Sequence, residues 1–280
     1  ENNKFPLFEL FGRDEPFWPP PLFHIITALV YKVFININKD AADFASKMIS
    51  PVLGSLTLIL SFLIAKMLFN KKIAFYSLIF LTFIPLSIDY SVFSYVDGMV
   101  TFFVVLSVYL ALKNKIVLSS ITAGLAILTK YNGMFILPLL LFIVYMNNKG
   151  NIKNLIKNVA IVSIIPIAIG SIWFIRNWIY LGNPVWPFMN SIFHGIEVKT
   201  FVELGVGAVN LRNVFSINAI TNIYLGIFGV PNGDIGTLTF LEIPHLNIFF
   251  NLWLLGTIIF SIPLLIGVIS KNLKYKGLLF

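Results

Sequence analysis

The stretch KNKIVLSSITAGLAILTKYNGMFILPLLLFIVYMNNK, residues 113–149, decides how this chain is built. It holds two apolar segments, 116–129 and 133–146, with a short polar break between them. Neither segment can cross a membrane alone, because a helix rises about 1.5 Å per residue and a span needs roughly 20 residues. Lysines stand at both outer ends of the stretch. The pattern therefore predicts a helical hairpin that starts and ends on the same face of a membrane.

The composition of the whole chain agrees with a membrane location. Of its 280 residues, 58% are hydrophobic and only 11% are charged. A soluble domain of this length needs far more charge to cover its surface. The chain has no cysteine, which excludes disulfides, thiol catalysis and thiolate metal sites. The fold class that we predict is an all-α integral membrane protein, a multi-pass helix bundle.

Further apolar segments flank the hairpin. They lie at about 48–69, 73–95, 98–112, 159–175 and 248–270, giving about seven transmembrane segments in all. Residues 22–37 have apolar positions at helical spacing but are interrupted by His24 and Lys32, which favours an amphipathic helix in the membrane interface. The interpretation divides the chain into an extracytoplasmic loop with this helix (1–47), a transmembrane bundle (48–175), an extracytoplasmic loop region (176–247) and a last transmembrane helix with a cytoplasmic end (248–280).

The lysines predict which face is which. Four clusters contain no acid: 66, 71 and 72; 113 and 115; 149, 153 and 157; and 271, 274 and 276. Three out-and-back excursions (73–112, 116–146 and 159–270) place these eleven lysines on one face, which the positive-inside rule makes cytoplasmic. All 12 acids then lie on the other face, so the net charge of +8 divides into +11 and −3. This separation argues against a nucleic-acid partner. It also predicts that the short helices end within the membrane, facing a cavity.

Two acids are candidate catalytic groups. Asp97 begins a helix on the outer side, where it is either a helix cap or a carboxylate in an outward cavity. Asp14, in Arg13-Asp14-Glu15-Pro16, is either part of a solvated turn or a base. Asp89 is placed in the expected substrate cavity. We assign no metal or other cofactor, and leave a divalent cation open.

Two cations are candidate phosphate ligands. Lys130 lies at the hairpin tip, away from the face on which the other lysines of residues 66–157 cluster. It either extends its ammonium group to the membrane interface or pairs with Asp89 or Asp97. The functional alternative is that it holds an anionic phosphate. Arg176, one of three arginines, is either an interfacial anchor or a bidentate phosphate ligand. Their neighbours Tyr131, Asn132 and Asn177 are expected to line the substrate cavity.

Four motifs in order resemble the GT-C-type membrane glycosyltransferases, which use polyprenyl- or dolichyl-phosphate sugars. These enzymes include protein O-mannosyltransferases and lipid A aminoarabinose transferase. The motifs are PPPLFHIITALVYKVF (19–34), DGMVTFF (97–103), GLAILTKYNG (124–133) with Leu137-Pro138, and WFIRNW (173–178) with Gly182-Asn-Pro. The resemblance implies an inverting transferase, multi-pass in the cell membrane, with its site on the extracytoplasmic side. It implies a lipid-phosphate-sugar donor, a lipid, glycan or protein acceptor, and contact with membrane lipids.

Two departures from the family pattern affect the site. The family's acidic pair lies well upstream of the Pro-Pro motif, whereas Asp14-Glu15 lies only shortly before Pro20. We therefore expect the chain, which begins at Glu1, to be a piece of a longer protein whose catalytic base precedes it. Trp18 also replaces the family's lysine before the prolines, which would leave phosphate binding to Lys130 and Arg176. The alternative function is a lipid or sugar transporter or flippase using the same cavity, and a third class is a scaffold without a site.

Overall fold

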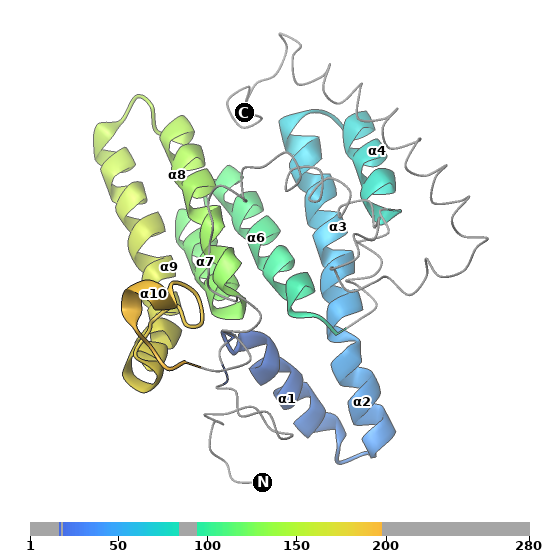
Figure 1. The fold of residues 1–280 in the computed structure, drawn as a ribbon. Helices are drawn as coiled ribbons and strands as arrows, with labels where there is room; N and C mark the ends of the chain where they lie inside the picture. Colours follow the sequence, from blue (N-terminus) through green and yellow to red (C-terminus); the bar gives the residue numbers. More distant parts are fainter. Residues whose placement is uncertain (1–16, 18, 84–93, 198–280) are drawn as a thin grey trace, which may run out of the picture. The chain divides into compact units, whose positions relative to one another are not determined.

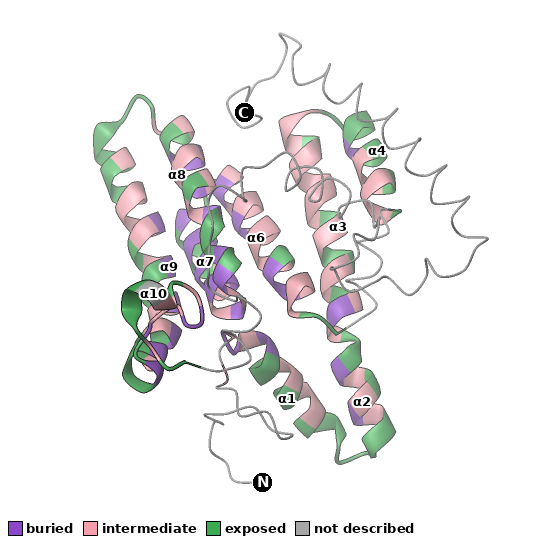
Figure 2. Cartoon of the chain, in the orientation of Figure 1, coloured by how far each residue is buried: buried purple, intermediate pink, exposed green. Residues whose placement is uncertain are grey.

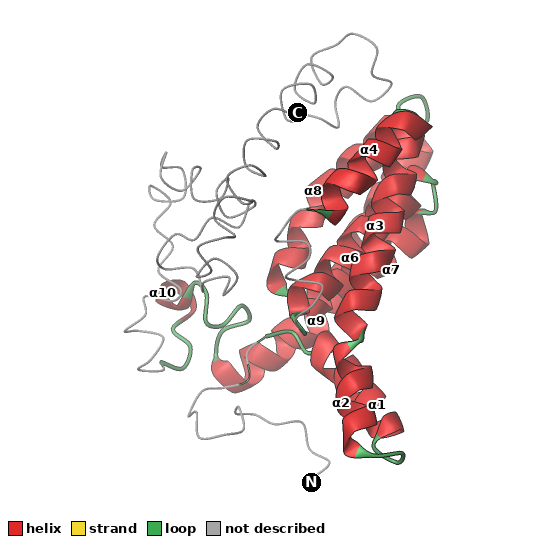
Figure 3. Cartoon of the chain, turned by 90° about the vertical axis from the view of Figure 1, so that its right-hand side faces the viewer, coloured by secondary structure: helices red, strands yellow, loops and turns green. Residues whose placement is uncertain are grey.

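The computed structural model describes residues 17, 19–83 and 94–197, and every regular element within these ranges is helical (Figure 3). The chain separates into two compact units, one of residues 1–46 and 99–214 and the other of residues 47–98 and 215–280. The described residues confirm the all-helical prediction. The predicted segment 248–270 and most of the predicted loop region lie outside them.

The second unit contains a pair of packed helices, α3 (Ile49–Leu68) and α4 (Lys71–Thr82). Asn70 begins α4 by accepting a hydrogen bond from the Ile73 amide at 2.9 Å, as an N-cap residue does. The predicted segment 48–69 is confirmed as α3. The predicted segment 73–95 is confirmed only as far as Thr82, since residues 84–93 are outside the described part.

The remaining helices, drawn in Figure 1, lie wholly or mostly in the first unit. They are α1 (Leu22–Phe34), α2 (Lys39–Lys47), α6 (Val96–Leu112), α7 (Ile116–Thr129), the 3-10 helix η1 (Tyr131–Phe135), α8 (Ile136–Asn147), α9 (Ile152–Leu181) and α10 (Asn190–Phe193). The predicted segments 98–112 and 116–129 are confirmed as α6 and α7. The predicted helix 22–37 ends three residues early as α1, which packs against α7.

Three predictions about helix boundaries were wrong. The polar stretch 38–47 is helical, because Asn38 accepts a hydrogen bond from the Ala41 amide at 2.7 Å and Ala42 and Ser46 bury one side of α2. The second segment of the hairpin opens with η1 before α8 begins. The segment 159–175 is longer at both ends, because Asn151 caps the start of α9 and Gly182, at φ +69°, ends it.

The core of this unit is the contact between α7 and α9, where buried residues concentrate on α7 (Figure 2). A Cβ on Gly124 would lie 2.8 Å from the Ile169 side chain, and a Cβ on Gly170 would lie 2.5 Å from that of Ile127. Each glycine thus receives an isoleucine of the other helix, the close approach that small residues allow between membrane helices. Residue numbers rise together along the two helices in these contacts, so α7 and α9 run parallel. This direction fits the predicted hairpin, in which α8 runs back between them.

The outward surface of α9 is apolar. The exposed side chains include Ile164, Ile167, Ile172 and Ile175, a surface that suits lipid better than water. Among the described residues, two helical stretches, Lys39–Leu68 and Ile152–Leu181, are long and apolar enough to cross a membrane. The number of spans stays a prediction.

Candidate active site

The tip of the hairpin is held against α7 by a glycine. Lys130 leaves α7 in an extended conformation, and its amide still donates to the Ala126 carbonyl at 3.1 Å. The η1 turn then folds back, so that a Cβ on Gly133 would lie only 2.4 Å from the Ala126 carbonyl group. Since the obstacle is backbone, no side-chain movement would relieve it. Glycine at this position fixes where Lys130 and Tyr131 lie.

Beside the tip, α9 presents a polar and aromatic face. Trp173, Arg176, Asn177 and Tyr180 recur at intervals of three and four residues, which places them on one side of the helix. The Arg176 guanidinium lies 4.6 Å from the Trp173 ring centre and 5.9 Å from that of Tyr180. Asn177 is 0% exposed. Stacking between aromatic rings limits the positions open to the guanidinium.

A chain of hydrogen bonds connects this face to the hairpin tip. Arg176 Nη1 donates to Asn177 Oδ1 at 2.7 Å, and Asn177 Nδ2 donates to the Tyr131 hydroxyl at 2.6 Å. Tyr131 donates in turn to the Trp186 carbonyl at 3.1 Å. The Tyr131 hydroxyl therefore accepts one hydrogen bond and donates another within this network. Tyr131 also stacks on Phe174, with 5.8 Å between ring centres.

The Arg176 guanidinium is only partly satisfied by this network. Its Nη1 also donates to the Phe17 carbonyl at 2.9 Å, so one nitrogen serves two acceptors. Its Nη2 is buried and has no hydrogen-bond partner in the structure as described. Burying an unpaired donor of a charged group is costly, and such groups usually have a partner. Among the described residues, this Nη2 therefore remains able to take a further hydrogen-bond acceptor.

The segment after α9 closes the site from another side. Asn183, fully buried, accepts from the Val185 amide at 2.9 Å and donates to the Phe188 carbonyl at 2.9 Å. The turn holds Trp186, which is 1% exposed and donates from Nε1 to the Ile196 carbonyl at 2.8 Å. This arrangement places the Trp186 carbonyl against Tyr131.

Comparison with known families identifies the class of protein. A family model described as dolichyl-phosphate-mannose-protein mannosyltransferase matches residues 18–174. The chain belongs to this family. It is therefore a membrane glycosyltransferase of the GT-C type, as the four motifs indicated. No curated protein and no solved structure matches the chain.

The sequence-predicted residues of this glycosyltransferase are only partly brought together. Tyr131, Asn177 and Arg176 form one network, and Lys130, half-buried, directly precedes Tyr131. Asn132 is exposed. Their roles in the reaction stay predictions.

Of the three acidic candidates, one lies in the described part of the chain. Asp97 is half-buried in the first turn of α6, while Asp14 and Asp89 lie outside the described residues. The described residues contain no group of three His, Asp or Glu side chains that would hold a metal ion. Phe17 and Trp186 were not predicted as residues of this network, because they contribute backbone carbonyls and so leave no side-chain signal.

Proposed function

We propose that this glycosyltransferase transfers a sugar from a polyprenyl- or dolichyl-phosphate donor to a hydroxyl acceptor on the extracytoplasmic side of the membrane. The observation that carries the proposal is the buried, unpartnered Nη2 of Arg176. A phosphate oxygen would satisfy it with a charge-assisted hydrogen bond, the interaction that guanidinium groups make best.

The surroundings of Arg176 support a role in leaving-group stabilisation. Asn177 and the Phe17 carbonyl hold Nη1, and Trp173 stacks on the guanidinium, so the group is oriented before a ligand arrives. Negative charge grows on the lipid phosphate as its bond to the sugar breaks. A fixed cation in a site partly shielded from water stabilises that charge most in the transition state.

The proposed reaction forms one bond and breaks one. The acceptor oxygen attacks the anomeric carbon while the bond from that carbon to the phosphate oxygen breaks, which inverts the configuration. A carboxylate takes the proton of the acceptor hydroxyl. Asp97 is a candidate for this base or for orienting the acceptor, and Asp14 is a second candidate. Lys130, next to Tyr131, is proposed to share the phosphate with Arg176.

The depth of the site supports entry of a lipid-linked donor. Ile116 of α7 and Ile161 of α9 line the same pocket near one end of this helix pair. Tyr131, just after α7, contacts Asn177 of α9 near the other end. From Lys157, at the end where the lysines cluster, to Asn177 the rise along α9 is about 30 Å, at ~1.5 Å per residue, which is roughly the thickness of the hydrocarbon core. A site at this level is within reach of a phosphate carried by a membrane lipid. Family membership favours this function over the transporter alternative.

The test is sugar transfer from a radiolabelled polyprenyl-phosphate sugar mixture in membranes carrying the chain. We expect Arg176→Ala to lower the rate about a hundredfold or more, the loss that follows removal of one charge-stabilising donor. Arg176→Lys should not restore the rate, because an ammonium cannot reach Asn177, Phe17 and a phosphate together. Lys115→Ala, a cation remote from the network, should transfer normally. Normal transfer by inserted Arg176→Ala protein would refute the proposed role.

A further inference from the structure

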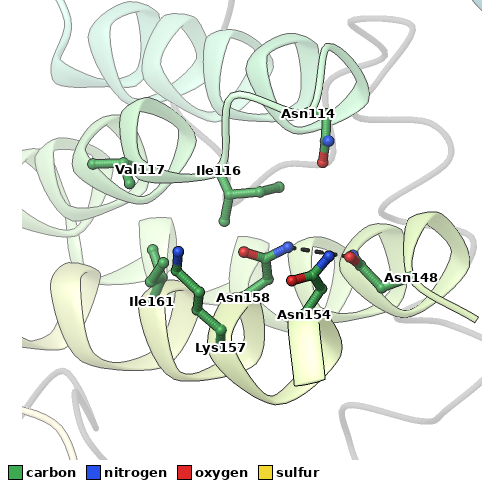
Figure 4. A pocket seen from close by; sticks show the side chains of 8 residues that line it. All are labelled: Asn114, Ile116, Val117, Asn148, Asn154, Lys157, Asn158 and Ile161. Carbon is green, nitrogen blue, oxygen red and sulfur yellow. Dashed lines mark hydrogen bonds between the residues drawn. The ribbon is translucent and has the colours of Figure 1, made fainter. Parts of the chain in front are cut away.

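A second polar site lies at the opposite end of the helices. A pocket of about 320 Å³ opens where the α6–α7 connection, the end of α8 and the first turns of α9 meet (Figure 4). Its polar lining consists of four asparagines and one lysine: Asn114, Asn148, Asn154, Asn158 and Lys157. Nothing in the proposed transfer reaction uses these residues.

Two of these asparagines are explained by folding. Asn114 has φ +58°, a left-handed conformation that asparagine tolerates better than most residues. Asn148 ends α8 and donates to the Val144 carbonyl at 2.7 Å. Asn154 and Asn158 instead lie within α9, where asparagine is a weaker helix former than leucine or lysine. They are four residues apart and line the same pocket, and Asn158 also joins α9 to the end of α8 by its bond to Asn148.

The amides and the lysine together suit a phosphate with hydroxyl groups attached. Asn158 Nδ2 donates to Asn148 Oδ1 at 3.3 Å, so these two amides are already oriented toward each other (Figure 4). Amides both donate and accept, which matches hydroxyl groups. Lys157 supplies a positive charge, and the start of α9 adds the positive end of its helix dipole.

The charge around the pocket has one sign. Lys113, Lys115, Lys149 and Lys153 all lie in the neighbouring turns, and the sequence has no acid between Asp97 and Glu197. This is the end of the molecule that the lysine pattern predicts to be cytoplasmic. A membrane surface with anionic lipids attracts such a cluster.

One wall of the pocket is apolar. Ile116 and Val117 of α7 face Ile161 of α9 across it, and Val117 is also exposed on the outside (Figure 4). A free phosphate ester would leave this wall in contact with water. A phospholipid would cover it with the glycerol backbone and the first part of its acyl chains, beside the apolar surface of α9.

We propose that this pocket binds the headgroup of an anionic, hydroxyl-bearing phospholipid of the phosphatidylglycerol type. Lys157 binds the phosphate, and the amides of Asn154 and Asn158 bind the headgroup hydroxyls. The bound lipid fixes the α6–α7 connection to the start of α9. The proposal does not depend on the transfer reaction, so a binding measurement tests it separately.

The experiment is native mass spectrometry of the purified chain titrated with phosphatidylglycerol or phosphatidylcholine. We expect phosphatidylglycerol to bind preferentially, and Lys157→Gln to weaken it about fivefold. Lys153→Gln is the matched control, since it removes the same charge one turn earlier on α9 but does not line the pocket, and it should change binding less than twofold. Asn158→Leu should reduce the preference for phosphatidylglycerol.

Three results would overturn the proposal. Equal weakening by Lys157→Gln and Lys153→Gln would mean general charge attraction instead of a site. Equal binding of the two lipids would exclude headgroup recognition. Competition by soluble glycerol 3-phosphate at the concentration at which the lipid binds would show that the occupant is a free phosphate ester.

Discussion

The two ends of the α7–α9 pair carry opposite kinds of polar site. At one end, Tyr131, Asn177 and Arg176 form a buried hydrogen-bond network closed by the Trp186 segment. At the other, asparagines and Lys157 line a pocket that is open to the surroundings. The same pair of helices thus supports a fixed site and an adaptable one.

The difference follows from burial and from the choice of cation. A buried network is useful for catalysis because its donors are oriented before charge develops. It uses arginine, whose planar fork holds several acceptors at once. The open pocket uses lysine, a flexible point charge that suits a variable headgroup. Matched residues at the two ends allow this difference to be tested.

The largest difference is expected between two asparagines of the same helix. Asn177→Leu removes both the acceptor of Arg176 and the donor to Tyr131, so the guanidinium loses its orientation. We expect transfer to fall about a hundredfold, as when an oriented charge-stabilising group is lost. Asn158→Leu makes the same change at the open end and should leave transfer within about twofold. Initial rates in membranes with equal amounts of inserted protein provide the measurement.

Substituting one glycine at each end by alanine tests how tightly the chain is packed there. Gly133→Ala would force a Cβ against the Ala126 backbone, and such overpacking costs about 1–3 kcal/mol. Gly150, in the α8–α9 connection, has nothing within 4 Å of the position of a Cβ, so Gly150→Ala should change stability by less than about 0.5 kcal/mol. Thermal unfolding in detergent would measure both. Similar melting temperatures for the two variants would mean that the hairpin tip is not held as described.

The smallest expected effect comes from one hydroxyl group. Tyr131→Phe keeps the stacking on Phe174 but removes the hydrogen bonds with Asn177 and the Trp186 carbonyl. We expect transfer to fall about tenfold, because leaving a buried partner unsatisfied costs roughly 1–3 kcal/mol. Tyr145→Phe, near Lys149 at the open end, is the control and should transfer normally. Equal transfer rates for Tyr131→Phe and Tyr145→Phe would mean that the Tyr131 hydroxyl has no role in the reaction.

Much of the helical arrangement was readable from charge and length. The lysines at 113, 115 and 149 predicted the hairpin, and the apolar segment 116–129 gave the bounds of α7. The unusual positions of Lys130 and Arg176 also drew attention to Tyr131 and Asn177, which the structure joins by a hydrogen bond, while the role of this end stays a prediction. These signals are local, because they depend on residue type and spacing along the chain.

The contacts that assemble the site had no such signal. Tyr131 and Asn177 are far apart in sequence, and only the parallel packing of α7 on α9 brings them together. The carbonyls of Phe17 and Trp186 contribute through backbone, which any residue type would supply. The helix α2 was missed because its buried side is made of small residues, Ala42 and Ser46, instead of an apolar stripe.

The central claim, that the lipid phosphate binds at the closed end, is tested most directly by photo-crosslinking. The probe is a polyprenyl phosphate with a diazirine next to the phosphate, and the labelled peptides are located by mass spectrometry. We predict labelling in residues 173–180 and around Tyr131, lost in Arg176→Ala and retained in Lys157→Gln. Labelling confined to residues 148–158, at the open end, would contradict the account.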